Sequence, residues 1–223
     1  MKALRFYSRY WAAVGGLVFV GLAFWLGIKG DAIPTLQRLA VLLYMSLLFH
    51  QFEEYIFPGG FPAACNVALF GEKENVHLYP LNQLSALTVN VFCAYPLYLV
   101  GIVFYEHLWI IIFLSYFTML QVLMHCIKMN ISLRSWYCPG CLSALLVMLP
   151  IGVYTLHFLA SNYTFPHYYW WAPALVFPVV AGLTIMLPIK VFQSRETRFG
   201  FAKHEADDFA VKHGIASLFR KDK

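Results

Sequence analysis

Three residues whose side chains can bind a metal or move a proton lie within one helical turn of each other: His50, Glu53 and Glu54. They close an apolar stretch that begins near Leu39 and is long and hydrophobic enough to lie in a membrane. Ionisable groups are costly at such a place, so they indicate a functional site. On a helix His50 faces both glutamates, because residues three and four apart are neighbours. We therefore take this cluster as the centre of the fold.

A second histidine completes a set of metal ligands. One helix can offer two ligands when a histidine and a carboxylate lie one turn apart, and His125 from a later apolar stretch would add a third. Two histidines and one carboxylate leave positions for water and substrate. We expect His50, Glu54 and His125 to bind zinc or iron. Glu54 is preferred to Glu53 because an i, i+4 partner reaches the same point above the helix with less strain.

The remaining polar residues are candidates for acid–base work. Glu53 would act as general base on metal-bound water, and Asn90 and Asn130 would orient substrate or donate to a developing oxyanion. The chemistry also works without a metal. Two adjacent carboxyls in a low dielectric do not both ionise easily, so one of them becomes the stronger base. That glutamate, beside His50, would activate water directly. In that case His50, Glu53 and Glu54 are themselves the catalytic groups.

Three classes of function follow from this cluster. The favoured one is a membrane-embedded enzyme, hydrolytic or metal-dependent, which acts on a lipid or another apolar substrate. The first alternative is a small transporter or a protein that conducts protons or ions. The second is an accessory subunit without chemistry, in which the same side chains only tie the membrane spans together by hydrogen bonds.

A cysteine pair, Cys138 and Cys141, offers a different chemistry. Two cysteines at this spacing form a redox dithiol or half of a zinc site. No second pair completes a zinc site in the sequence. Pro139 and Gly140 between them are explained by a turn into a helix, so we do not favour a redox role.

The composition indicates an all-α, integral membrane helical bundle. The chain is 61% hydrophobic and only 12% charged, whereas soluble domains carry roughly 25% charged residues. The mean hydropathy of +0.65 agrees. Most of the net charge of +5 lies near the two ends, which indicates membrane topology and contact with lipid rather than with nucleic acid.

Apolar runs divide the chain into a membrane domain at residues 1–193 and a charged tail at residues 194–223. The tail is expected on the cytoplasmic side, with a short surface helix near residues 207–220. A short helix is expected at 64–70, and kinks at Pro178 and Pro188. Six spans are predicted, at residues 11–28, 39–56, 81–105, 108–131, 142–159 and 173–192.

Charge asymmetry predicts the orientation of these spans. With six spans, nine of the lysines and arginines up to residue 198 fall on the side of the termini and two on the other. We therefore place both termini in the cytoplasm and expect the protein in the bacterial inner membrane. This orientation puts His50 and His125 at one depth, roughly 10 Å inside the cytoplasmic boundary.

Two sequence patterns extend over the middle of the chain. They are formed by His50, Glu53, Glu54 and Pro58, and by His125, Asn130, Tyr137, Pro139 and Gly140. In this combination residues 39–154 resemble the HXXEE-domain membrane proteins, which are multi-span and largely without assigned function. The resemblance implies the site more than an activity. A weaker likeness connects the chain with CAAX-type intramembrane proteases, but Pro58 stands where an arginine is expected.

Overall fold

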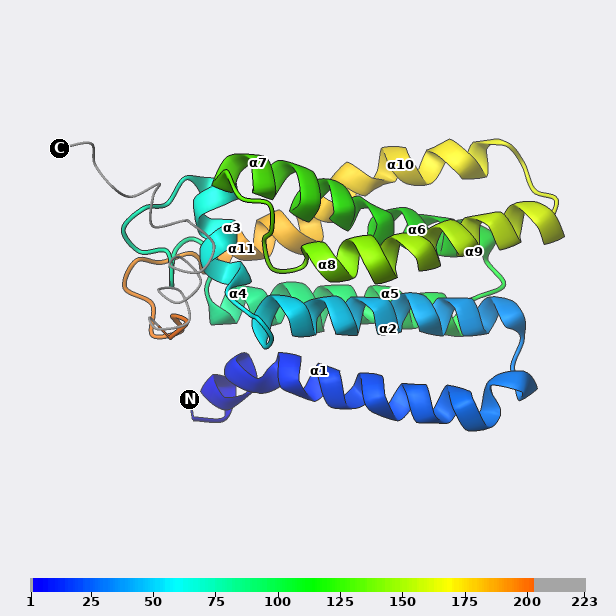
Figure 1. Ribbon diagram of the computed structural model, residues 1–223, viewed down its shortest axis with the longest axis horizontal. Helices are drawn as coiled ribbons and strands as arrows, with labels where there is room; N and C mark the ends of the chain where they lie inside the picture. Colours follow the sequence, from blue (N-terminus) through cyan, green and yellow to red (C-terminus); the bar gives the residue numbers. More distant parts are fainter. Residues whose placement is uncertain (1, 203–223) are drawn as a thin grey trace.

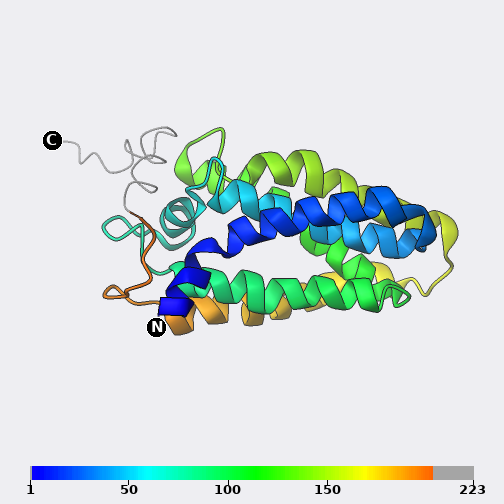
Figure 2. The same ribbon diagram turned by 90° about the horizontal axis from the view of Figure 1, so that it is seen from below.

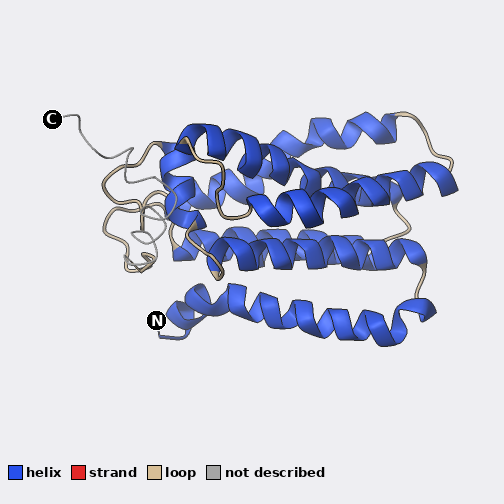
Figure 3. Cartoon of the chain, in the orientation of Figure 1, coloured by secondary structure: helices blue, strands red, loops and turns tan. Residues whose placement is uncertain are grey.

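The computed structural model describes residues 2–202, and these residues form helices without any β-strand (Figures 1 and 3). The predicted all-α class is confirmed. The first two helices are α1 (Lys2–Lys29) and α2 (Thr35–Tyr55), joined through the short 3₁₀ turn η1 (Gly30–Ala32). The helix predicted near 207–220 lies outside the described residues.

We call each long helix a rod, and the four later rods each contain a π-helical segment between two α-helical segments. The first rod consists of α4 (Gln83–Leu87), η2 (Thr88–Ala94) and α5 (Tyr95–Val103), and the second of α6 (Leu108–Val122), η3 (Leu123–Met129) and α7 (Asn130–Leu133). The third consists of α8 (Cys141–Ser143), η4 (Ala144–Met148) and α9 (Leu149–Asn162), and the fourth of α10 (Tyr168–Ala181), η5 (Gly182–Met186) and α11 (Leu187–Phe192).

Five of these rods are long and apolar enough to cross a membrane: α1 with η1, and the four rods that contain π-helical segments. Helix α2 is not among them, although it has 21 residues. Arg38 near its start and the polar cluster near its end lower its hydropathy. It nevertheless runs beside the others in the bundle (Figures 1 and 2). The structure thus supports several membrane spans, and the count of six stays a prediction.

Three of the π-helical segments have a proline immediately after them. Pro96, Pro150 and Pro188 each stand two residues beyond the end of η2, η4 and η5. Proline lacks an N–H and its ring clashes with the carbonyl four residues earlier, and a widened turn accommodates both effects. The predicted kink at Pro188 therefore corresponds to η5, whereas Pro178 lies inside α10.

The segment η3 has no proline after it. Asn130 follows instead, and its side-chain Nδ2 donates to the carbonyl of Cys126 at 3.3 Å. This widened turn carries His125. No proline accounts for this widened turn. Here the side chain of Asn130 instead donates a hydrogen bond to one of its carbonyl groups.

One end of the bundle is closed by α3 (Phe61–Phe70), which lies across it. The turn from α2 into α3 needs Gly59 and Gly60, whose φ angles are 74° and 90°. The second span was predicted to end at residue 56, and α2 ends at Tyr55; α3 begins three residues before the expected helix at 64–70. The beginning of α1, the end of α2, the beginning of α8 and the end of α11 lie at the same end (Figure 1).

Candidate metal centre

Side chains of His50, Glu54 and His125 meet where the end of α2 faces η3. One ligand atom of each lies within 4.8 Å of the others. Glu54 Oε1 is 3.6 Å from His50 Nε2 and 3.4 Å from His125 Nε2. All three residues are at most 5% exposed. The three residues predicted as metal ligands from the sequence therefore lie together.

Hydrogen bonds on the far side of each ring fix how the histidines point. His125 Nδ1 lies 2.8 Å from the carbonyl of Pro139, which can only accept, so Nδ1 carries the hydrogen. His50 Nδ1 lies 2.8 Å from Ser143 Oγ. That hydroxyl donates to the carbonyl of Gly140 at 3.3 Å, so it accepts from His50. This pattern assigns a lone pair to Nε2 of both rings, facing Glu54.

Three electron-pair donors that face each other in a buried place require a cation or a proton between them. Two imidazole nitrogens and a carboxylate oxygen are ligands that zinc and iron accept. Ligands about 2.0–2.1 Å from a tetrahedral zinc lie about 3.4 Å apart, which fits the two distances to Glu54 Oε1. Hydrogen bonds from the other ring nitrogen to an oxygen are the usual support of metal-binding histidines. The donor set therefore fits a metal.

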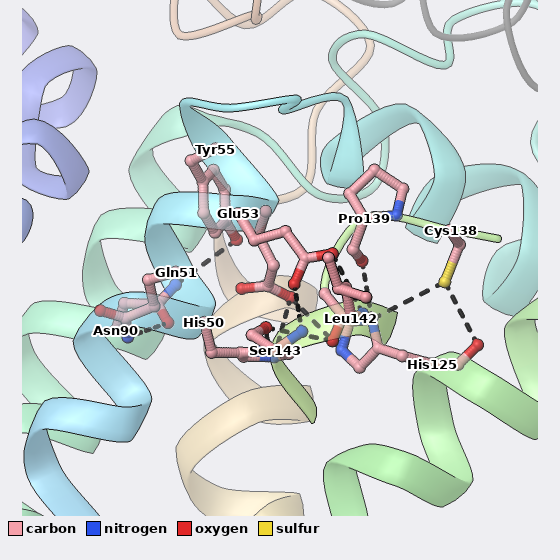
Figure 4. Close-up of polar contacts among 12 residues, drawn as sticks. His50, Gln51, Glu53, Tyr55, Asn90, His125, Cys138, Pro139, Leu142 and Ser143 are labelled. Atoms are coloured by element: carbon pink, nitrogen blue, oxygen red, sulfur yellow. Dashed lines mark hydrogen bonds and ion pairs between the residues drawn. The ribbon is translucent and has the colours of Figure 1, made fainter. Parts of the chain in front are cut away.

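The carboxylate of Glu53 lies at the beginning of α8, beside Leu142 and Ser143 (Figure 4). It accepts the backbone N–H groups of Leu142 at 3.1 Å and Ser143 at 2.7 Å, and the hydroxyl of Tyr137 at 2.7 Å. Helix α8 is the first turn of the long helix Cys141–Asn162. A carboxylate at such an N-terminus satisfies free N–H groups and the helix dipole. The acid–base role of Glu53 stays a prediction.

The two predicted asparagines occupy different places. Asn90 lies on η2, accepts from Gln51 Nε2 at 2.8 Å and donates to the carbonyl of Ala86 at 2.8 Å. It lines the cavity beside the metal centre. Asn130 instead donates to the carbonyl of Trp136 at 3.0 Å and so braces the loop before α8. The structure brings Asn90 toward the centre and Asn130 toward the loop.

Gly140 has a function that the sequence analysis did not identify. Its φ angle is 95°, and a Cβ added there would lie 2.5 Å from His125 Nδ1 and 2.8 Å from His50 Cε1. Only glycine allows the loop to approach both rings so closely. Ser143 was missed as well, because a serine in an apolar run gives no distinctive signal. For Gly140 the signal was the Pro139–Gly140 turn.

The cysteines have separate partners. Cys138 Sγ donates to the carbonyl of His125 at 3.2 Å, while Cys141 Sγ lies 2.8 Å from Cys126 Sγ. Within residues 2–202, the only group of metal-type ligands close enough together is the centre of His50, Glu54 and His125. The cysteines therefore support the loop and η3 around the centre rather than supplying ligands.

A cavity of about 250 Å³ lies against the metal centre. The three ligand residues stand on its wall, together with Tyr55 and Asn90. The rest of the lining is mainly apolar and comes from α3, η2, α5, α6, η3, α10, η5 and α11. The centre therefore faces a mainly apolar space. The apolar substrate expected from the sequence stays a prediction.

The loop after α3 is tied to the segment after α11 at the same end of the bundle. Glu72 accepts the backbone N–H groups of Glu74 and Asn75 and forms an ion pair with Arg195 at 2.7 Å. The guanidinium of Arg195 also lies 4.2 Å from the ring centre of Tyr79. Burial opposes ionisation of Glu72, but these N–H groups and Arg195 outweigh it and lower its pKa below the ordinary value.

Comparison with known families matches residues 41–155, just over half of the chain, to a family described as "Protein of unknown function with HXXEE motif". The match contains all three ligand residues, Glu53 and the loop before α8. No curated protein and no solved structure matches the chain. The likeness to CAAX-type proteases gains no support from these comparisons.

Proposed function

The chain belongs to the HXXEE family, and from the geometry of the site we propose that it is a metal-dependent enzyme embedded in the membrane. One observation carries the proposal. Two imidazole lone pairs and a carboxylate oxygen, all buried, converge beside an apolar cavity. The two histidine nitrogens offer no hydrogen to Glu54, so either a metal ion or a proton on Glu54 must lie between the three groups. A set of two imidazoles and one carboxylate favours the metal.

His50, Glu54 and His125 hold zinc or iron in this proposal, and the metal would polarise a carbonyl or activate a water for hydrolysis. Ser143 and the carbonyl of Pro139 keep the rings in position. The hydroxyl of Tyr55 accepts from Asn90 Nδ2 at 3.4 Å, which leaves its hydrogen to donate into the cavity. Tyr55 is thus a candidate to bind a substrate oxygen, a role the sequence analysis gave to the asparagines.

The substrate class follows from the surroundings of the centre. The cavity lining is mainly apolar and lies among helices that are long and apolar enough to span a membrane. A charged, water-soluble substrate would lose its hydration there without gaining partners. A lipid or another apolar molecule with one polar group to be cleaved is the class that this space favours.

Elemental analysis of the purified protein in detergent tests the proposal. The wild type should contain about one zinc or iron per chain after equilibration with the metal. Glu54→Gln keeps the shape of the side chain but removes the negative ligand, so the metal should be lost. Glu106→Gln, at an exposed glutamate outside the site, should retain it.

Two results would overturn this assignment. One is wild-type protein that binds neither zinc nor iron, which would leave the conduction of protons or ions as the explanation for the facing acceptors. The other is a Glu54→Gln variant with the metal content of the wild type, which would place the metal elsewhere.

The same proposal includes the topology. We infer six spans, with α2 as one of them, both termini in the cytoplasm and the centre near the cytoplasmic surface of a bacterial inner membrane. The excess of lysine and arginine on the side of the termini supports this orientation. The start of α1 and the end of α11 at one end of the bundle fit an even number of spans.

A further inference from the structure

A second hollow, of about 480 Å³, lies along η5 and α11 beside the end of α3. Three residues, Phe70, Met186 and Ile189, line both this groove and the cavity of the metal centre. The groove and the cavity therefore lie next to each other, with these three side chains between them. The other residues of the groove are Gly182, Leu183, Leu187, Lys190 and Gln193.

The groove opens on a surface suited to lipid. Leu183, Met186 and Leu187 are 59%, 50% and 49% exposed, and they belong to a rod long and apolar enough to cross a membrane. Gly182, at the start of η5, leaves a gap, since a Cβ at this position would meet no atom within 4 Å. Hydrocarbon chains of the bilayer would contact this face.

The size of the cavity decides how much of a substrate it can hold. At about 250 Å³ it is smaller than the roughly 300–1,000 Å³ of pockets for drug-sized ligands. A lipid therefore cannot lie inside completely. Only the part next to the cleaved group would fit, and the rest must leave through an apolar opening.

We propose that the substrate of the metal centre is a lipid that enters sideways from the bilayer between α3 and η5. Its hydrocarbon chain lies in the groove along η5 and α11, and its polar group reaches His50, Glu54 and His125. This inference rests on the proposed function for the chemistry. The path itself rests on the shared lining, the exposed apolar face and the size of the cavity.

Gly182→Leu is the variant that tests the path. A Cβ added at Gly182 meets no atom within 4 Å, so the larger side chain can enter the groove. Gly21→Leu is the matched control, since a Cβ on Gly21 also meets no atom within 4 Å and this residue lies on α1, outside the groove. The probe is phosphatidylcholine with a photoreactive diazirine on one acyl chain, in nanodiscs, and labelled peptides are identified by mass spectrometry.

We expect the probe to label Met186 in the groove and Cys65 or Phe177 in the cavity. Gly182→Leu should reduce the cavity labelling by about tenfold, since filling an apolar site leaves no room for a chain. Gly21→Leu should leave the labelling unchanged. Both variants should keep the metal content of the wild type, which shows that they fold.

Labelling of the cavity that Gly182→Leu leaves unchanged, or labelling confined to the outer surface, would overturn the path. Metal analysis of the same samples separates the two proposals. Metal without labelled cavity residues overturns the lipid path alone. Labelled cavity residues that Gly182→Leu protects, in a protein that binds no metal, would support the path and overturn the metal-dependent function.

Discussion

The hydrogen bond between His50 and Ser143 gives the sharpest test of the metal centre. Ser143→Ala removes the hydroxyl that lies 2.8 Å from His50 Nδ1. It leaves in place the backbone N–H of residue 143, which donates a hydrogen bond to Glu53. Without this partner the hydrogen of His50 can move to Nε2, the nitrogen that faces Glu54. The variant therefore leaves all three ligand residues in place and disturbs only the orientation and tautomer of one of them.

The expected effect has two separate parts. Loss of an oxygen that supports a metal-binding histidine typically weakens the metal about 10–100-fold, which corresponds to about 1.4–2.7 kcal/mol. Loss of one buried hydrogen bond costs the metal-free protein about 0.5–1.5 kcal/mol of stability. The first effect requires the metal centre, whereas the second occurs wherever a buried hydroxyl is removed.

Ser115→Ala separates the two effects. Ser115 is also fully buried and its hydroxyl donates to the carbonyl of Ile111 at 2.8 Å, inside α6 and away from the centre. Competition of zinc with a chelator in detergent measures the affinity, and thermal unfolding of the metal-free variants measures stability. Both variants should lose similar stability, but only Ser143→Ala should bind zinc more weakly. Equal zinc affinities for Ser143→Ala, Ser115→Ala and the wild type would refute the reasoning.

Three further predictions concern Glu53, Glu72 and the topology. Glu53→Gln should cost about 1.5–3 kcal/mol of stability, because a neutral amide replaces a carboxylate that accepts hydrogen bonds from backbone N–H groups. The variant should still retain the metal. Loss of metal without loss of stability would contradict this prediction. The pKa of Glu72 is lowered in the folded protein, so its stabilisation is complete above the ordinary carboxyl pKa of about 4.3 and is lost as pH falls through the folded pKa. The melting temperatures of wild type and Glu72→Gln should therefore converge on acidification. A constant difference between them would exclude the effect. Reporter fusions should alternate outside, inside, outside, inside, outside at Gly30, Glu72, Glu106, Arg134 and Asn162. A reversed order would refute the orientation.

The helices were predictable where charged or turn-forming residues bound an apolar run. The rod from Leu108 to Leu133 ends within two residues of the span predicted at 108–131. Prediction was poorer where polar or aromatic residues continue a helix. Helix α1 begins at Lys2 rather than at residue 11, and α10 begins at Tyr168 rather than at residue 173. Hydropathy identifies the part of a helix that contacts hydrocarbon and not the turns beyond it.

The convergence of His50, Glu54 and His125 was predictable for two separate reasons. His50 and Glu54 share one helix, so their spacing alone places them together. His125 was connected to them by its depth, which follows from the order and direction of the spans. The supports of the rings were not predictable, because the carbonyl groups of Pro139 and Gly140 belong to a loop. Backbone oxygens leave no signal in side-chain chemistry, and their position depends on how the loop packs.

The two adjacent glutamates of the motif have different surroundings, and this difference explains their spacing. Glu54, four residues after His50, faces the same point as that histidine. Glu53, one residue earlier, is turned toward the start of the helix Cys141–Asn162 and accepts its N–H groups. That helix carries Ser143, and the loop before it carries the carbonyl of Pro139.

Glu53 therefore anchors the element that orients both histidines, while Glu54 contacts them directly. A single turn of α2 supplies a histidine and a carboxylate of the candidate metal centre and the anchor for the parts that support the rings. The adjacent glutamates therefore have different partners, the histidine rings for Glu54 and the start of the supporting helix for Glu53, so neither can take the place of the other.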